Sequence, residues 1–458
     1  MKKKAVTAIV IGAGDRGADV YANYALRFPD EMKVVAVAEP IEERRNLVKV
    51  KHNLKEDRCF SSWEKILAEQ KLADLAIVAT QDQMHAEPAI LAMRKGYDVL
   101  LEKPMANTID DCKELVEVSK ETGKLLQICH VLRYAPYFSQ LKSVIESGRI
   151  GDIVNISWRE NVSYWHYSHS YIRGNWHNRD ESSPMILAKS CHDMDLLFWL
   201  IRSPTKKIHS FGNQTHFGRF NQPEGAPDRC LDGCPVSESC LYYAPRLYLD
   251  LVPLIHMHKK AGSISEKLFS SLVLRYPNLT QIPPFKKVKE YTGWPISVIS
   301  KDLSYEGRIK ALQETNYGKC VYAIDDHNIV DHQIVNIEFD NKVTASFTMH
   351  GFSDEEGRSF RIDGTKGTIK GDYFFSKQII SIIDVLTGKE EQIGTEKIDM
   401  AHGGGDDVIM KVFLKSVRFR EKEDILTTAS NALESHLMAF AADISRVEER
   451  IVEMKELR

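Results

Sequence analysis

A glycine-rich turn near the N-terminus constrains the fold of this chain more than any other feature. The apolar, β-branched run AVTAIVI (residues 5–11) is typical of a strand buried on both faces, and it leads directly into GAGDRG (Gly12–Gly17). The next apolar run ends at an acidic residue, Glu39, 22 positions after Gly17. A strand, a glycine turn, a helix and a second strand that ends in a carboxylate form a dinucleotide-binding fingerprint. We therefore predict a Rossmann domain whose first helix presents its N-terminus to a pyrophosphate.

The residues of this turn also indicate which dinucleotide binds. Glu39 can accept hydrogen bonds from ribose hydroxyls, and its charge would repel a 2′-phosphate, which favours NAD over NADP. Arg44 and Arg45 leave NADP open as the less favoured alternative. The predicted contacts of the turn with the cofactor come from Gly12, Ala13, Gly14, Asp15, Arg16 and Gly17.

The order of the predicted strands and helices divides the chain into two domains. Strands alternate with helices up to about residue 130, which indicates βαβ units and a doubly wound parallel sheet. From about residue 150 the strand-like runs indicate a large, open, mainly antiparallel sheet. We predict an α/β Rossmann domain over residues 1–130, followed by an α+β domain over residues 131–458 for substrate binding and oligomerisation. A segment at about 217–325 is too long for a simple loop and is predicted to be an insertion with helices of its own.

Composition limits the partners and the compartment. The net charge is −3, so no basic field attracts nucleic acid or an anionic membrane. No apolar run reaches the roughly 20 residues of a membrane-spanning helix. The basic start MKKK precedes only about eight apolar residues that end in glycines, which favours a strand over a signal peptide. We expect a cytoplasmic protein with reduced thiols and with neither a nucleic-acid nor a membrane partner.

Further motifs follow the fingerprint in a fixed order. Together with the fingerprint they resemble the Gfo/Idh/MocA oxidoreductases, the family of glucose–fructose oxidoreductase and inositol dehydrogenase. The resemblance is specific over residues 5–200 and weaker beyond, and the 217–325 insertion is not part of it. The motifs are ATQDQMH (79–85), LLEKPMA (100–106), HVLRYAPYF (130–138), SGRIGDI (147–153), KSCHDMDLL (189–197), IDGTKGTI (362–369), HGGGD (402–406) and SHLMAFAADISR (435–446).

The resemblance implies a nicotinamide in the cleft between the two domains and a homo-oligomer, a dimer or tetramer, formed through the C-terminal sheet. It places Lys103 of the Glu-Lys-Pro box near the nicotinamide and the reacting carbon, with Glu102 orienting it. Further contacts with the cofactor are implied for Thr80, Gln81, Gln83, His85, His130 and Arg133.

The segment MILAKSCHDMD (Met185–Asp195) supplies the remaining candidates for catalysis. His192 suits a general base because imidazole titrates near neutral pH, and Lys103 suits the stabilisation of a developing alkoxide. Members of the family commonly carry Asp four residues before this histidine, where this chain has Ala188 followed by Lys189. If the segment is one helix, Lys189, His192 and Asp195 share a face, so that Asp195 fixes the imidazole tautomer and Lys189 enters the cleft. The alternative is that Lys189 pairs with Asp193 on a solvated face.

Aromatic and histidine side chains upstream of this segment suit a carbohydrate, which combines apolar faces with hydroxyl groups. The alternative is ordinary packing between the domains, and for the glycine-flanked His402 a tight turn. The predicted substrate-binding residues are Arg173, Trp176, His177 and His402.

The insertion carries closely spaced cysteines in the pattern C-x3-C-x5-C. Cys230, Cys234 and Cys240 leave a tetrahedral site one ligand short, which Cys320 or His216 could supply. A structural zinc or iron–sulfur site would tie together a loop-rich insertion. The alternative is a set of unligated thiols.

Three functions remain open at this point. The first is an NAD(H)-dependent oxidoreductase that acts on a hydroxyl of a sugar, sugar acid, cyclitol or glycoside. The second is an NAD-dependent glycosidase that acts by oxidation, elimination and reduction with no net redox change. The third is a non-catalytic NAD-binding regulator, which would need neither Lys103 nor His192.

Overall fold

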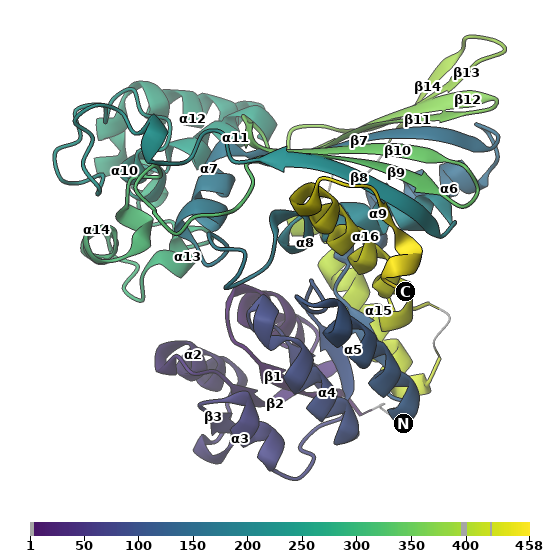
Figure 1. Cartoon of the computed structure of the whole chain (residues 1–458). Coiled ribbons are helices and arrows are strands. Elements are labelled where there is room, and N and C mark those ends of the chain that lie inside the picture. The colour runs from purple at the N-terminus through teal and green to yellow at the C-terminus, as the bar shows by residue number, and fades with distance from the viewer. Residues whose placement is uncertain (1–3, 395–400, 422–423) are drawn as a thin grey trace.

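The computed structural model describes residues 4–394, 401–421 and 424–458, so the first three residues of the basic leader lie outside it. Two sheets dominate the molecule, one in the N-terminal third and one above it in Figure 1. In the described ranges, no helix is both long and apolar enough to cross a membrane.

The N-terminal sheet is parallel throughout, with the strand order β3-β2-β1-β4-β5-β6. This order is that of the predicted Rossmann fold, and it reverses between β1 and β4, where such sheets bind their ligands. The strands are β1 (Val6–Ile11), β2 (Met32–Ala38), β3 (Cys59–Phe60), β4 (Leu75–Val78), β5 (Asp98–Leu101) and β6 (Leu126–Ile128). The helices are a π-helical stretch (Asp15–Ala22), α1 (Asn23–Arg27), α2 (Glu42–His52), α3 (Trp63–Ala68), α4 (Ala86–Arg94) and α5 (Ile109–Thr122).

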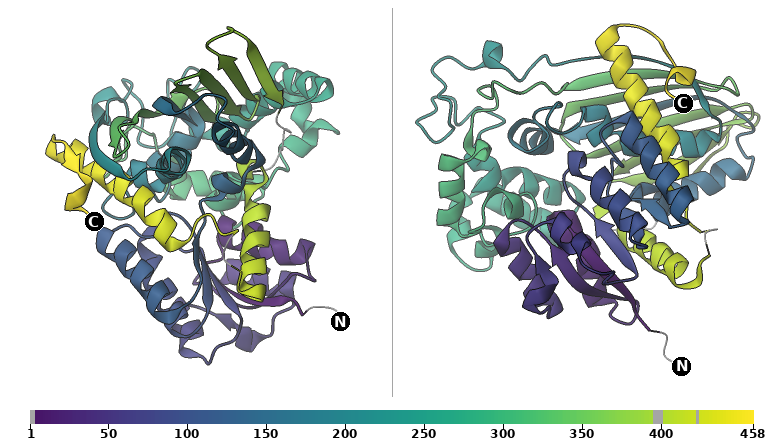
Figure 2. Two further views of the ribbon diagram at one scale, coloured as in Figure 1. Left: turned by 90° about the vertical axis from the view of Figure 1, so that its right-hand side faces the viewer. Right: turned by 60° about the horizontal axis from the view of Figure 1, so that its bottom comes forward.

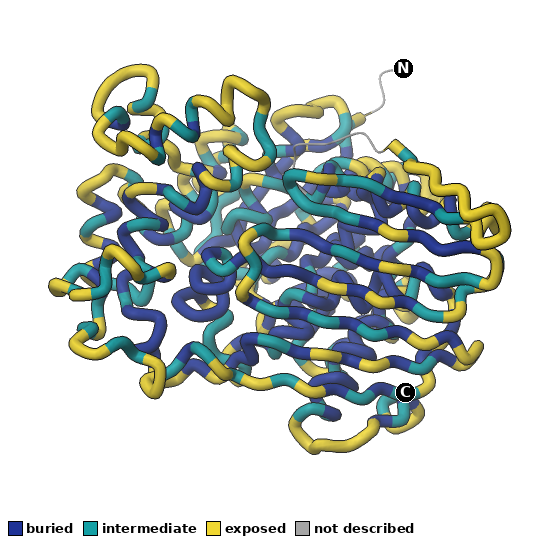
Figure 3. The backbone as a smooth tube through the Cα atoms, turned by 90° about the horizontal axis from the view of Figure 1, so that it is seen from above, coloured by how far each residue is buried: buried dark blue, intermediate teal, exposed yellow. Residues whose placement is uncertain are grey.

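The second sheet has nine strands in the order β14-β13-β12-β11-β7-β10-β9-β8-β15. Among the strands that the structure describes in this sheet, only β7 and β10 pair in parallel, so the prediction of a mainly antiparallel sheet is confirmed. One face packs on helices α6 (Pro136–Glu146), α9 (Cys191–Ile201) and α16 (Ala429–Glu448), and residues alternate between buried and exposed along the strands (Figure 3). The strands are β7 (Ile153–Ser163), β8 (Thr205–Asn213), β9 (His332–Phe339), β10 (Thr344–Ser353), β11 (Gly357–Gly364), β12 (Gly367–Phe374), β13 (Gln378–Asp384), β14 (Glu390–Gly394) and β15 (Val452–Glu453).

The C-terminal helices return to the Rossmann part, as Figure 2 shows. Ile409 and Phe413 of α15 (Gly405–Phe419) share a buried apolar cluster with Val10 of β1, and α16 packs on α5 as well as on α9 and β8. The two sheets are therefore joined by packed helices in addition to the chain crossing near residue 130.

The segment between β8 and β9, where the sequence predicts the insertion, folds into helices with an apolar cluster of their own. Its helices are α10 (Ala244–Tyr248), α11 (Val252–Ala261), α12 (Ile264–Arg275), α13 (Ile296–Ile299) and α14 (Tyr305–Glu314). The cluster also includes Trp165 of α7 (Tyr164–Tyr167), which follows β7.

Candidate active site

The glycine turn has the geometry that a dinucleotide requires. Gly12 has a φ of +88°, and a Cβ there would lie 2.5 Å from the carbonyl oxygen of Ala79. A Cβ on Gly17 would lie 1.9 Å from the carbonyl oxygen of Gly12, so strand, turn and helix are in direct contact. A Cβ on Gly14 would instead meet nothing within 4 Å. The backbone at Gly14 is thus open to an approaching phosphate, and the turn fits the cofactor.

Glu39 lies at this turn, with an almost fully buried side chain. Its carboxylate accepts hydrogen bonds from the amides of Ala13 (2.7 Å) and Ile41 (2.9 Å). Arg45 donates to the carbonyl oxygen of Glu39 at 2.5 Å. This bond holds Arg45 against the main chain, while the carboxylate of Glu39 occupies the end of β2.

Arg16 joins the glycine turn to two other segments of the chain. Its guanidinium lies 2.6 Å from Glu102 Oε1 and 2.6 Å from Asp406 Oδ1 at the start of α15, and it donates to the hydroxyl of Tyr21. Burial alone would raise the pKa of Glu102. The nearby Arg16 guanidinium and the Tyr21 hydroxyl instead hold this pKa below its usual value. Arg16 therefore forms ion pairs with two buried carboxylates that come from different segments of the chain.

Lys103 reaches from the Glu-Lys-Pro box to the second domain. Its Nζ donates to the carbonyl oxygen of Ala188 at 2.7 Å, and its amide donates to Glu102 Oε2 at 2.9 Å. The ring of His85 connects the Glu-Lys-Pro box to the preceding loop. Its Nδ1 lies 2.6 Å from the Pro104 carbonyl oxygen, and its Nε2 lies 3.1 Å from the Thr80 carbonyl oxygen. The amine of Lys103 is thus positioned across the domain junction by a neutral group.

His192 lies in the first turn of α9 and is buried, with 5 % of the residue exposed. Its Nδ1 has no hydrogen-bond partner among the described residues. The ring centroids of His130 and His402 lie 5.6 Å and 5.9 Å away. Burial and the charge of Lys103 hold the pKa of His192 well below its usual value, so the imidazole is neutral and can accept a proton.

The prediction that Lys189, His192 and Asp195 share one helix face is wrong. The first helix, α8 (Met185–Ala188), ends before Lys189, and α9 begins at Cys191. Asp195 does not fix the His192 tautomer, because both of its oxygens pair with the Arg133 guanidinium at 2.6 Å.

Lys189 does not pair with Asp193 either. Its Nζ lies 2.7 Å from Glu356 Oε1 and 3.9 Å from Glu160 Oε1. Burial opposes the charge of Lys189, but these carboxylates outweigh it and raise the pKa. Asp193 is held instead by Arg358, whose Nε is 2.8 Å from Asp193 Oδ1.

Two members of this group, Glu356 and Glu160, carry no signal in the sequence pattern. Glu356 lies in the turn between β10 and β11, and its Oε2 is 3.1 Å from Nδ1 of His166 in α7. Glu160, on β7, accepts from Ser190 and Arg358, and burial raises its pKa to about 8 despite that guanidinium. Neither residue belongs to a motif, because distant segments bring them together.

The predicted substrate residues separate into two groups. Trp176 Nε1 donates to Asp82 Oδ2 at 3.1 Å across the two domains, and His402 lies beside His192 with its Nδ1 3.0 Å from Asp406. Arg173 points into the insertion, where it donates to the carbonyl oxygens of Lys319 and Tyr242.

The remaining predicted residues are held by local partners. His177 lies against Gly174 O and Asp326. Gln83 donates to Gln81 at 3.2 Å, and the hydroxyl of Thr80 donates to the carbonyl oxygen of Met84.

No group of three or more His, Cys, Asp or Glu side chains within residues 4–394, 401–421 and 424–458 is placed to hold a metal ion. The predicted structural zinc or iron–sulfur site is therefore not supported by the structure. The alternative fourth ligand, His216, is also engaged elsewhere, because its Nε2 lies 3.0 Å from the Tyr322 hydroxyl.

Comparison with known proteins agrees with this architecture. Residues 6–130 match a family described as an oxidoreductase family with an NAD-binding Rossmann fold. Residues 138–230 match the GFO/IDH/MocA C-terminal domain, and residues 299–454 match the oxidoreductase family's C-terminal alpha/beta domain. The chain belongs to the Gfo/Idh/MocA family of NAD-binding oxidoreductases.

Individual relatives are distant. The chain is 23% identical to the putative oxidoreductase YteT of Bacillus subtilis over 84% of this chain and 82% of that protein. It is 28% identical to 2,7-anhydro-N-acetylneuraminate hydratase of Escherichia coli, and this match covers 46% of this chain and 53% of the hydratase. An oxidoreductase from Agrobacterium radiobacter, solved with NAD+, L-tartaric acid and magnesium, shares the fold with a TM-score of 0.63 and 13% identity, over 99% of this chain and 100% of that one.

Proposed function

We propose that the protein oxidises or reduces a hydroxyl-bearing carbon of a sugar, sugar acid, cyclitol or glycoside. The observation that carries this proposal is a neutral, buried His192, whose Nδ1 has no partner among the described residues and which lies near enough to Lys103 for that charge to lower its pKa. NAD, when bound, supplies the hydride acceptor or donor. The chain's own part is to orient the substrate and to move one proton.

His192 takes the hydroxyl proton during oxidation and returns it during reduction. Lys103 stabilises the negative charge that develops on the substrate oxygen. Its resting partner is the Ala188 carbonyl, and no ion pair within the described part of the chain cancels its positive charge. A substrate hydroxyl can displace a main-chain carbonyl more easily than a buried carboxylate.

NAD is preferred over NADP in this proposal. The Glu39 carboxylate lies where a 2′-phosphate would enter, and Arg45 is bonded to the main chain. Gly12, Gly14 and Gly17 would hold the pyrophosphate, and the Glu-Lys-Pro box together with the loop at Thr80–His85 would hold the nicotinamide half.

A second candidate is glycoside cleavage without net redox change, in which the hydride taken from the sugar is later returned. The observation that favours it is the Lys189–Glu356–His166 row, which provides further acid and base groups apart from His192. A relative named as a hydratase is consistent with a redox-neutral reaction on this scaffold.

A panel of free sugars and glycosides tests both candidates on the purified protein, after mass spectrometry has identified any retained cofactor. NADH accumulation that matches product formation supports the dehydrogenase. Cleaved glycoside without NADH accumulation supports the second candidate. A Lys103→Ala variant that still binds NAD, and that still has the biological effect of the wild-type protein, would instead support a non-catalytic regulator.

We also propose a homo-oligomer that forms through the outer face of the nine-stranded sheet. Phe211 and Ile334 are cross-strand neighbours there, 58 % and 40 % exposed. Light scattering of the wild type and of Phe211→Glu would test this, because only the wild type should form the oligomer.

A further inference from the structure

The insertion contacts the Rossmann domain as well as the second domain that carries it. In Figure 1 and in the right-hand view of Figure 2, its helices lie on the side of the molecule where α2 lies. The side-chain amine of Lys301, between α13 and α14, lies 2.8 Å from the carboxylate of Glu43 in the first turn of α2. Residues 258 positions apart in the sequence therefore join the insertion to the nucleotide-binding half of the molecule.

This contact lies beside the adenosine end of the predicted dinucleotide site. Helix α2 begins at Glu42, soon after Glu39, whose carboxylate is the group expected to bind the adenosine ribose. Arg44, the neighbour of Glu43, lies near the insertion's Tyr317. Burial raises the pKa of Tyr317, and the charge of Arg44 opposes that rise. Two successive residues of α2 thus lie close to residues from separate segments of the insertion.

The insertion also approaches the glycine turn, where the pyrophosphate is expected. Tyr291 of the insertion is partly exposed. Burial raises the pKa of its hydroxyl, and the nearby carboxylate of Asp15 raises that pKa further. Asp15 follows Gly14, the position at which the backbone is open to a phosphate. The insertion therefore approaches the site at two places, the turn that receives the pyrophosphate and the start of α2 beside the ribose.

The insertion is fixed more firmly to the second domain than to the Rossmann domain. The buried side chain of Arg173 donates to two main-chain carbonyl oxygens of the insertion, and Trp165 of α7 belongs to the insertion's apolar cluster. On the Rossmann side, by contrast, the side chains of Lys301 and Glu43 are 67 % and 54 % exposed. An exposed ion pair is weak and is screened by salt, so the contact with α2 opens more easily than the buried packing.

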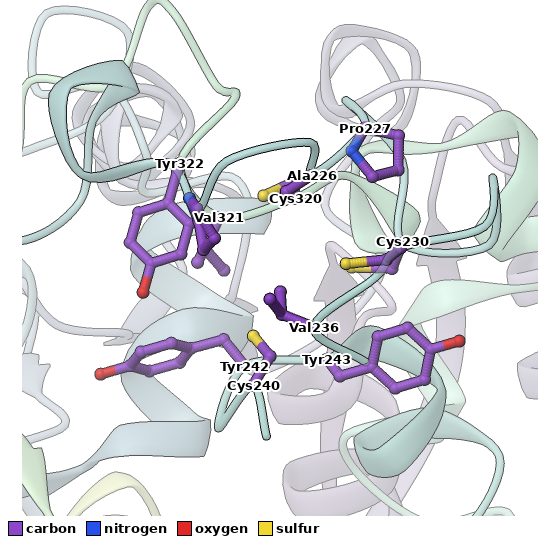
Figure 4. A pocket seen from close by; sticks show the side chains of 12 residues that line it. Ala226, Pro227, Cys230, Val236, Cys240, Tyr242, Tyr243, Cys320, Val321 and Tyr322 are labelled. Carbon is purple, nitrogen blue, oxygen red and sulfur yellow. The ribbon is translucent and has the colours of Figure 1, made fainter. Parts of the chain in front are cut away.

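The two ends of the insertion are tied together at its base. A β-bridge pairs Arg229 with Lys319, and the Cys230 amide donates to the Gly318 carbonyl oxygen at 2.9 Å. Side chains from both segments, Cys230 and Cys320 among them, line a small pocket at this base (Figure 4). Because its ends are held side by side, the insertion can separate from α2 as one unit.

We propose that the insertion forms the outer wall of the dinucleotide site, and that the cofactor enters and leaves when the insertion separates from α2. The inference rests on the proposed function in one respect, namely that NAD is the bound dinucleotide. The closed insertion shields the pyrophosphate and the adenosine ribose from solvent and slows dissociation. A cofactor that stays in place suits a reaction that takes a hydride from the substrate and later returns it, so slow exchange favours the redox-neutral candidate.

The test measures how fast NADH leaves the full-length protein, by chasing bound NADH with excess NAD+ and following NADH fluorescence. Lys301→Glu places two carboxylates opposite each other and should raise the dissociation rate about three- to tenfold. Glu43→Lys should do the same, and the double variant Lys301→Glu/Glu43→Lys should return to within about twofold of the wild-type rate. Lys267→Glu, on the exposed surface of α12, is the control and should leave the rate unchanged.

Hydrogen exchange of the same proteins, with folding checked by circular dichroism, tests the wall directly. NADH should slow amide exchange at the glycine turn and also in the insertion between Tyr291 and Lys301. Protection confined to the Rossmann domain, single variants that release NADH at the wild-type rate, or a double variant as fast as the single ones would overturn the proposal. Both measurements are made without substrate, so a protein that binds NADH but oxidises no sugar would overturn the proposed function and leave this result standing.

Discussion

The side-chain amine of Lys103, in the Rossmann domain, donates a hydrogen bond of 2.7 Å to the main-chain carbonyl of Ala188 in the second domain. The residue at position 188 therefore matters through its backbone, and the alanine side chain adds no competing charge. The amine meets the segment that carries His192 four residues further on. This contact joins the two halves of the proposed proton-transfer site.

Replacement of Lys103 by Met should remove the group that stabilises the developing oxyanion. We expect kcat/KM to fall by roughly 100- to 1,000-fold. NAD binding, measured by isothermal titration calorimetry, should change little. Lys95→Met is the matched control, since Lys95 is partly exposed and its side-chain amine donates to the main-chain carbonyl of Glu69. Unchanged turnover in Lys103→Met would remove Lys103 from the reaction.

The pH profile should reveal the neutral imidazole. Because burial and Lys103 hold the pKa of His192 well below about 6.5, the unprotonated base persists into mildly acidic solution. The acidic limb of kcat/KM should therefore lie below pH 6.5, with activity lost as the ring gains its proton. In Lys103→Met the limb should move to higher pH, because a repelling cation is gone. An acidic limb that stays in place in this variant would argue that another group is the base.

Replacement of Glu356 by Gln tests the carboxylate that pairs with both Lys189 and His166. Burial would raise the pKa of Glu356, but His166 and Lys189 hold it well below its usual value, so the wild-type group is ionised. The neutral amide leaves Lys189 without its nearest carboxylate, at 2.7 Å. If Glu356 serves substrate binding, KM should rise about tenfold while kcat changes less.

Asp354→Asn, in the same turn, is the control because its carboxylate is 83 % exposed. If glycoside cleavage is the reaction, Glu356→Gln should instead abolish cleavage and leave oxidation of a free sugar intact. Equal kinetics for wild type and Glu356→Gln would exclude both roles.

Local patterns in the sequence were sufficient for the Rossmann domain and for much of the candidate site. Gly12, Gly14, Gly17 and Glu39 lie close together along the chain, so their spacing carries the geometry. The break at Lys189 could not be predicted, because the apolar and charged residues around it fit one continuous helix. The partners of Lys189 and Asp195 were equally hidden: Glu356 and Arg133 come from distant segments, and only tertiary packing decides which carboxylate meets which cation.

Two neighbouring carboxylates of α15 allow a matched test of the domain junction. Asp406 is buried and pairs with Arg16, whereas Asp407 is more exposed and pairs with Arg27. Arg16→Met leaves Glu102 and Asp406 buried without their shared cation, so we expect unfolding free energy to fall by about 3 to 5 kcal/mol. Arg27→Met removes a surface pair and should cost below about 1 kcal/mol.

The loss in Arg16→Met should depend on pH. In the wild type, Arg16 helps to keep the pKa values of Glu102 and Asp406 below their usual values, so the stabilisation is full above about pH 4.5 and is lost as pH falls through the lowered values. Without Arg16, one of the groups that oppose the effect of burial is gone, so both pKa values rise and the carboxylates protonate more readily, although His402 still lowers the pKa of Asp406. Urea unfolding at pH 7 and pH 4 should therefore show a smaller difference between wild type and Arg16→Met at the lower pH. A difference that is equal at both pH values would mean that Arg16 acts through packing rather than through charge.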